Sequence, residues 1–315
     1  MAAMWRCCFA LLLLTACDRT TPGAPIPREG RLRGERPSVL ILAANQALPS
    51  DLDRQGGLAG DRLVAAGTRM AHAYARFDEA GAARADLMGA EALPGLTDGG
   101  DLRARFVAGG YRSVELDLDD LSPLWNGEGP GFAMIEVSGP KPLGAAAQAV
   151  ASLRAAGVAD RVMWAVTAWQ GDPQAPAISE QRLAVPLVIG YPGQLAPAEV
   201  RPQMVSHADL AATLLDLCGL GLTPGVGAEG QSFARILIKQ PHTWRGHVLA
   251  RRVQPVDGEA RAWVRSLKWC LIVGAASGDR LSWIETDPYA NSDDLGRPGA
   301  ASAEAEMRRV LGEWD

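Results

Sequence analysis

Long hydrophobic runs, strong net charge and the common catalytic signatures are all scarce in this 315-residue sequence. The apolar run Cys7–Leu14 is far shorter than the roughly 20 residues of a membrane-spanning helix, and no other run approaches that length. The formal net charge of −5 disfavours non-specific binding to nucleic acid. The G-x-S-x-G, P-loop, H-E-x-x-H and paired C-x-x-C patterns are absent. What is present is a globular body behind a short apolar leader.

The first 17 residues predict an export signal that ends in a lipid-anchored cysteine. Met1–Arg6 carries one positive charge, and the apolar run Cys7–Leu14 has the length of a signal-peptide core. The sequence Leu14-Thr15-Ala16-Cys17 then resembles the bacterial lipobox. Cleavage before Cys17 would place a lipid on its sulfur and attach the protein to a membrane. The alternative is a plain secretory signal followed by a chance cysteine.

The residues after Cys17 predict a tether and a location. Residues 18–36 are polar, rich in Pro and Gly and without period, which is typical of a flexible linker. An Asp directly after a lipidated Cys is typical of lipoproteins kept in the inner membrane of Gram-negative cells. Asp18 therefore predicts the periplasmic face of that membrane.

The mature body would have 299 residues after loss of residues 1–16, enough for one large α/β domain or a domain with a small partner. With Arg6 removed, 30 basic and 36 acidic side chains remain, a net charge of −6. A hydrophobic content of 48% supports a packed core. Cys218 and Cys270 lie in apolar patterns, which favours two buried free thiols over a disulfide.

Strand and helix patterns alternate through the first two thirds of the body. We expect strands at Ser38–Ala44, Tyr111–Leu118, Phe132–Val137, Arg161–Thr167 and Val185–Gly190, and helices at 58–74, 143–156 and 207–218, the last capped by Ser206 with Asp209 three residues on. This alternation predicts an α/β fold whose central sheet is mostly parallel and flanked by helices.

Short alternating strands follow from about residue 243. They begin at His247, Ala262, Leu267 and Leu281 and are followed by a helix at 301–313. They predict a small antiparallel sheet with a closing helix. The expected organisation is a signal at 1–16, a tether at 17–36, the α/β domain at 37–242 and the C-terminal subdomain at 243–315.

Four stretches of the body resemble the sulfatase family of the alkaline-phosphatase superfamily. They are Arg36–Gln46, Leu63–Ala75, Val185–Gly193 together with Val205–Gly219, and Val264–Val273 together with Trp283–Pro288. They span nearly all of 36–315 in the family's order. The resemblance implies the same α/β fold with a small C-terminal sheet, and calcium in active members of the family.

The resemblance also implies an active site, and this chain lacks its residues. Ala80 stands where the family has the cysteine that becomes formylglycine, and only Arg84 of that motif matches. The expected metal ligands are replaced by Asn45, Gln46, Trp169 and Gln170. The family's Lys and His are missing as well, and the chain is short near 120–130, where the family has a long insertion. We therefore expect no intact catalytic set, no bound metal and no cofactor.

Three functions remain open from the sequence. The first is a non-catalytic lipoprotein of the cell envelope that binds a glycan or a protein partner and no nucleic acid. The second is a sulfatase-like hydrolase of sulfuric or phosphoric esters with a rebuilt site. That site would use His207 or the acidic residues Glu115, Asp117, Asp119 and Asp120, for which a structural cap and a solvated strand edge are the simpler interpretations. The third is a purely structural envelope protein.

Overall fold

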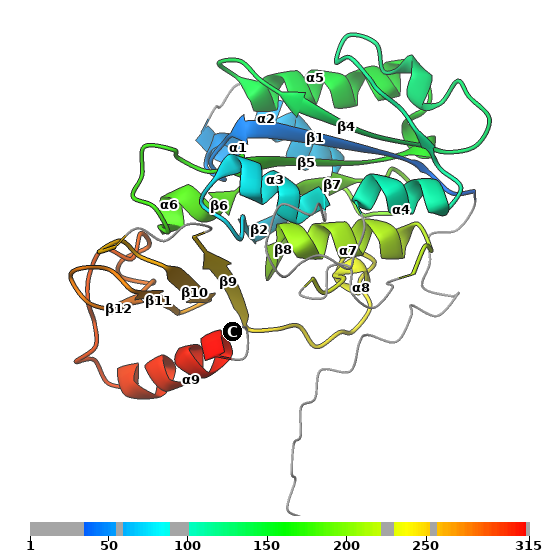
Figure 1. Cartoon of the computed structure of the whole chain (residues 1–315). Helices are drawn as coiled ribbons and strands as arrows, with labels where there is room; N and C mark the ends of the chain where they lie inside the picture. Colours follow the sequence, from blue (N-terminus) through cyan, green and yellow to red (C-terminus); the bar gives the residue numbers. More distant parts are fainter. Residues whose placement is uncertain (1–34, 55–58, 89–100, 222–229, 253–256, 313–315) are drawn as a thin grey trace, which may run out of the picture.

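The computed structural model describes residues 35–54, 59–88, 101–221, 230–252 and 257–312. The predicted signal and tether, with Cys17 and Asp18, lie outside this part of the chain. The described residues form a large mixed sheet covered by helices on both faces and a separate four-stranded antiparallel sheet beside it (Figure 1). No described helix is both long and apolar enough to cross a membrane.

The larger sheet has eight strands among the described residues. They are β1 (Ser38–Gln46), β2 (Thr68–Tyr74), β3 (Arg112–Ser113), β4 (Gly131–Val137), β5 (Val162–Gln170), β6 (Ala184–Val185), β7 (Val188–Gly190) and β8 (Glu199–Ser206). Their order is β3-β4-β1-β5-β7-β2-β6, with β8 paired to β2. The β3–β4, β4–β1, β1–β5 and β2–β8 pairs are parallel, so the expected mostly parallel sheet is confirmed.

Helices cover both faces of this sheet (Figure 1). They are α1 (Asp51–Arg54), α2 (Ala59–Ala66), α3 (Ala80–Met88), α4 (Leu102–Ala108), α5 (Pro142–Ala155), α6 (Glu180–Leu183), α7 (His207–Leu217) and α8 (Ala234–Leu237), with 3₁₀ turns at Ser122–Leu124 and Ala159–Arg161. α2 packs beside α5, while α3 packs beside α4 and α7 on the other face. The sheet between them is shielded from water, as the unbroken apolar run of β1 predicts.

The predicted helix at 58–74 is wrong in its second half. α2 ends at Ala66, and Thr68–Tyr74 forms β2. A Cβ at Gly67 would lie 2.6 Å from the carbonyl oxygen of Ile189, so the chain passes close to β7 at this point. β2 is paired on both sides, with β8 on one and with β6 and β7 on the other. Pairing with distant strands overrides the helical spacing of the apolar residues.

The predicted strand at Tyr111–Leu118 is also mostly wrong, since only Arg112 and Ser113 pair with β4. The residues that follow turn back on themselves. The carboxylate of Asp117 accepts the N–H of Asp119, and that of Asp120 accepts the N–H of Ser122. Such local side-chain bonds to the backbone compete with a strand ladder.

The predicted strand at Val185–Gly190 is divided into β6 and β7 on either side of Pro186 and Leu187. Both pieces run antiparallel to β2. Proline has no N–H to donate, so the ladder is interrupted there.

The C-terminal sheet and its closing helix are confirmed. β9 (His247–Arg251), β10 (Ala262–Ser266), β11 (Trp269–Val273) and β12 (Arg280–Trp283) pair in the order β12-β11-β10-β9, and α9 (Ala300–Gly312) packs on them. Trp269 and Trp283 meet edge to face with ring centroids 4.6 Å apart. Ala300 and Met307 of α9 are buried in the same cluster.

A buried polar network joins the two sheets. The hydroxyl of Tyr74 donates to Glu180 at 2.9 Å, and Nε of Arg265 donates to the other carboxylate oxygen at 3.1 Å. The rings of Tyr74 and Trp263 lie 5.0 Å apart. Cys270 is buried in the same cluster and Cys218 in the main core, and both are free thiols, as predicted.

Candidate functional site

The predicted site positions lie where parallel strands end together. In the register of the sheet, Ala43 of β1 is paired with both Glu136 of β4 and Thr167 of β5, and Gln46 is paired with Gln170. The structure therefore brings the carboxyl ends of β1, β4 and β5 to one edge of the sheet. We call the set Asn45, Gln46, Glu136, Trp169 and Gln170 the carboxyl edge.

Strand alternation divides the carboxyl edge between two faces of the sheet. Side chains of a strand point alternately up and down, so Asn45 and Trp169 lie on the face of Ala43 and Thr167. That face carries α3 and α7 (Figure 1). Gln46 and Gln170 lie on the opposite face, which carries α5. Strand alternation therefore places two of the four positions that the resemblance implies as metal ligands on each face of the sheet.

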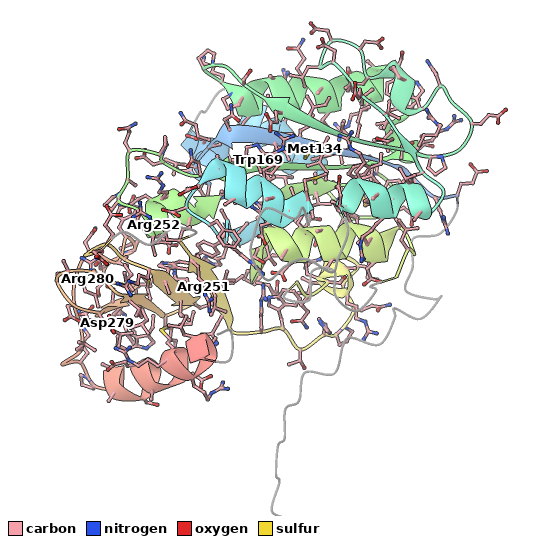
Figure 2. The ribbon with its side chains drawn as sticks, viewed as in Figure 1. Met134, Trp169, Arg251, Arg252, Asp279 and Arg280 are labelled. Atoms are coloured by element: carbon pink, nitrogen blue, oxygen red, sulfur yellow. The ribbon has the colours of Figure 1, made fainter. Side chains whose placement is uncertain are left out.

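Trp169 fills the α7 side of the carboxyl edge. Its indole is almost completely buried, at 1% exposure, and is labelled in Figure 2. It meets the ring of His207 edge to face, with centroids 6.2 Å apart and an interplanar angle of 77°. A large apolar side chain is packed here, where the resemblance implies a metal ligand.

His207 is a buried part of this packing and is not exposed to a substrate. It is 2% exposed, and its Nε2 lies 3.4 Å from the hydroxyl oxygen of Thr167. Desolvation lowers the pKa of His207 to about 4, against the opposing effect of the Ala168 backbone. The imidazole is therefore neutral near pH 7.

The start of α7 is held by a cluster that the sequence predicts in part. Ser206 and Asp209 form the expected capping box, in which the N–H of Ser206 donates to Asp209 Oδ2 at 2.7 Å. The structure adds two partners, because the N–H of Gln231 donates to Oδ1 at 2.7 Å and Arg245 forms an ion pair with the same carboxylate. We call Ser206, Asp209, Gln231 and Arg245 the α7 anchor.

The nucleophile position is the first residue of α3. Ala80 is half-buried there, and its methyl group has no atom that can attack an ester. One turn later, Arg84 pairs with Glu136 of β4 at 2.7 Å, with both side chains about half exposed. Glu136 thus offsets the charge of Arg84, the one residue of this chain that matches the family's nucleophile motif.

The sequence does not predict the contacts of three charged residues that the structure brings together near Ala80. Asp78 is buried, and its carboxylate lies 3.8 Å from Nε of Arg252. Nε of Arg182 donates to the carbonyl of Asp78 at 2.9 Å. Burial raises the pKa of Asp78, with Arg252 opposing the shift. No local sequence pattern indicates these contacts, because they join segments more than 100 residues apart.

The same loop is bonded to the C-terminal sheet. The N–H of Arg251 donates to the carbonyl of Arg76 at 2.8 Å, and Phe77 forms a β-bridge with Arg251. Figure 2 labels Arg251, the last residue of β9, and Arg252, which follows it. The loop that would carry the nucleophile is thus fixed by the smaller sheet.

The described residues do not fit the calcium that the family implies. Among them, no group of three His, Cys, Asp or Glu side chains is placed to hold a metal ion. Asn45 and Gln46 are exposed amides without charge, and Trp169 has no oxygen. The acidic residues Glu115, Asp117, Asp119 and Asp120 are exposed, and two of them bond the local backbone.

Comparison with known proteins supports the predicted family. Residues 176–253 match the family model described as N-sulphoglucosamine sulphohydrolase, C-terminal. The chain is sulfatase-like. This confirms the resemblance to the sulfatase family within the alkaline-phosphatase superfamily. The matched segment contains all residues of the α7 anchor and ends at residue 253, just after β9. A search of curated protein sequences finds no match.

Solved structures share the sulfatase-like fold over most of the chain. BT4656 in complex with its substrate D-glucosamine-2-N,6-O-disulfate has a TM-score of 0.72 at 13% identity, covering 89% of this chain and 97% of that one. BT1596, a 2-O GAG sulfatase, has a TM-score of 0.73 at 14% identity, covering 89% and 92%. A phosphonate monoester hydrolase from Silicibacter pomeroyi has a TM-score of 0.68 at 13% identity, covering 88% and 94%.

Proposed function

We propose that this sulfatase-like protein is a non-catalytic lipoprotein of the cell envelope that binds a glycan or protein partner. The observation that carries the proposal is the burial of Trp169 at the carboxyl edge, beside a helix that starts with Ala80. Together they replace a metal ligand and a nucleophile with apolar groups. Covalent catalysis then has neither an attacking atom nor a charge to stabilise the developing anion.

The remaining polar groups suit binding better than ester hydrolysis. Asn45 and Gln46 are exposed amides, which donate and accept hydrogen bonds without attracting a cation. The carboxylate of Glu136 lies beside Arg84 and offsets its charge, which weakens the attraction of this position for a sulfate. Hydroxyl-rich carbohydrate is the first ligand to test, because BT4656 binds a glucosamine derivative.

The location is part of the same proposal. A lipid on Cys17, followed by Asp18, would hold the body at the periplasmic face of the inner membrane. Recovery of the protein from outer-membrane fractions would contradict this placement.

Turnover assays separate this proposal from a rebuilt hydrolase. The purified protein is incubated with an aryl sulfate and with an aryl phosphate, each with added calcium, magnesium or zinc. We expect no release of the aryl alcohol above the blank. Turnover lost in Arg84→Ala or His207→Gln, and kept in the matched surface variant Arg308→Ala, would overturn the proposal.

A further inference from the structure

The loop between β5 and α6, residues 171–179, is closed at its base (Figure 1). It follows directly after Gln170 of the carboxyl edge. At its base, the N–H of Gly171 donates to the carbonyl of Arg182 at 2.8 Å. A Cβ at Gly171 would lie 2.6 Å from the carbonyl oxygen of Ala184, so the two ends of the loop are in close contact. Compact surface loops of this kind, with adjacent ends, are frequently functional.

The side chain of Arg182 bonds this loop to its surroundings. Its Nη1 donates to the carbonyls of Pro173 and Ala175, at 3.1 and 3.2 Å. Its Nε donates to the carbonyl of Asp78, in the loop that leads to Ala80, at 2.9 Å. One guanidinium thus joins two loops, through bonds to neutral carbonyls that are weaker than bonds to a carboxylate.

A strained residue lies near the end of the 171–179 loop. Ile178 has a φ of 52°, in the left-handed region, where a β-branched residue is an outlier. Its side chain is 1% exposed and packs in the cluster that contains Tyr74 and Trp263. Burial therefore holds the backbone in a conformation that isoleucine itself disfavours. Such strain is typical of switch regions and ligand clamps.

The middle of the loop is stiff and faces water. Gln174 and Pro176 are exposed. Pro173 and Pro176 fix two of the φ angles, and the N–H of Ala175 donates to the carbonyl of Asp172 at 3.2 Å. Motion of this loop is therefore concentrated at its ends.

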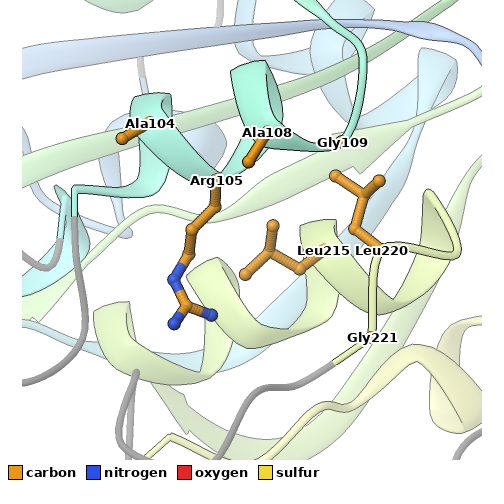
Figure 3. Close-up of a pocket in the computed structure, with 7 residues that line it drawn as sticks. All are labelled: Ala104, Arg105, Ala108, Gly109, Leu215, Leu220 and Gly221. Carbon is orange, nitrogen blue, oxygen red and sulfur yellow. The ribbon is translucent and has the colours of Figure 1, made fainter.

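The cleft between α4 and α7 lies away from this loop (Figure 3). It has a volume of about 340 Å³, and its lining includes Gly109, Leu215 and Leu220. The carbonyl of Gly109 accepts a hydrogen bond from Arg36, which precedes β1. The cleft is therefore near the start of β1, at the opposite end from the carboxyl edge. Access to the carboxyl edge depends on the loops that follow the strands, and not on this cleft.

We propose that the 171–179 loop is a lid at the carboxyl edge that opens as a unit, with Ile178 as its hinge and Arg182 as its latch. In the closed state, which the structure shows, the guanidinium joins the lid to the loop before Ala80. Opening breaks the three bonds of the guanidinium and lets Ile178 leave the left-handed region. The lid's effect on a bound partner rests on the proposed function, whereas its opening does not.

Amide hydrogen exchange of the full protein, followed by nuclear magnetic resonance, tests the latch. We expect the N–H groups of Gly171, Asp172 and Ala175 to share one protection factor, at least about 100-fold below that of β1. Arg182→Gln is expected to lower the shared factor about tenfold and to leave β1 unchanged. Arg161→Gln is the matched control, because Arg161 is exposed, and it is expected to change neither value.

A pair of substitutions tests the hinge. Glycine adopts a φ of 52° without strain and alanine does not, while both remove the buried side chain of Ile178. Ile178→Gly is therefore expected to unfold at a higher urea concentration than Ile178→Ala, the reverse of the order at ordinary positions.

Three results would overturn the proposal. They are a higher urea midpoint for Ile178→Ala than for Ile178→Gly, loop amides that exchange independently or as slowly as β1, and unchanged protection in Arg182→Gln. Turnover of the aryl esters would overturn the proposed function and leave these measurements as they are, so the two failures are distinguishable.

Discussion

The carboxyl edge and the α7 anchor both lie at the carboxyl ends of strands in the larger sheet, but their side chains differ in what they do. In the α7 anchor, the buried carboxylate of Asp209 satisfies two backbone donors and pairs with Arg245. In the carboxyl edge, amides and an indole stand where charged ligands are implied, and the one ion pair is half exposed. Among the described residues, the α7 anchor is thus a buried charged cluster, whereas the carboxyl edge carries one carboxylate, Glu136, which pairs with Arg84 near the surface.

The largest expected effect comes from the α7 anchor. Asp209→Ala removes the buried carboxylate that pairs with Arg245 and accepts two backbone N–H groups, so we expect a loss of about 4 kcal/mol in the free energy of unfolding. Urea denaturation at pH 7 measures it. The exposed Asp61→Ala is the control, with an expected change below about 0.5 kcal/mol. A loss below about 1 kcal/mol at Asp209 would remove the contrast between the two regions.

A smaller effect is expected at the boundary of the two regions, from the titration of His207. Its folded-state pKa of about 4 lies below the ordinary 6.5, so between these values the unfolded chain takes up a proton that the folded chain does not. Stability therefore falls as the pH decreases from 6.5 to 4, by about 3 kcal/mol from this group.

Urea denaturation at pH 7 and at pH 4.5 measures this slope in the wild type and in His207→Gln. The variant is expected to lose less stability on acidification than the wild type. The matched change at the exposed His242 is expected to leave the slope close to that of the wild type. Equal slopes for His207→Gln and wild type would contradict the buried, neutral imidazole.

The smallest effect is expected from the ion pair of the carboxyl edge. Since Arg84 and Glu136 are both about half exposed, a double-mutant cycle with alanine at each position should give a coupling of about 0.5 kcal/mol. A coupling above about 2 kcal/mol would show that the pair belongs to a rigid, water-excluded site. The carboxyl edge would then resemble the α7 anchor.

The sequence predicts those parts of the fold that local physical rules determine. β1 follows from its unbroken apolar run, and the start of α7 follows from the spacing of Ser206 and Asp209. β2 is mistaken for a helix because its conformation is set by strands on both sides, which no window of the sequence contains. β8 is missed because its first five residues lack the usual strand pattern of buried apolar and exposed polar side chains. Val200 and Pro202 are exposed, whereas the polar residues between them are partly buried.

The candidate site divides in the same way. The replacement of ligands at Asn45 and Trp169 can be followed along the sequence, because each comes at the end of a predicted strand. The packing of Trp169 on His207 and the pairing of Asp78 with Arg252 cannot, since they depend on how distant elements meet. The sequence therefore predicts which family residues are replaced, and the structure shows how the side chains at those positions pack.

Calcium titration tests most directly whether the carboxyl edge has lost its metal site while the fold is kept. The purified protein, with its folding checked by circular dichroism, is titrated with calcium in a calorimeter. The account predicts heats equal to those of dilution. A saturable one-to-one isotherm that is lost in Asn45→Ala would contradict it.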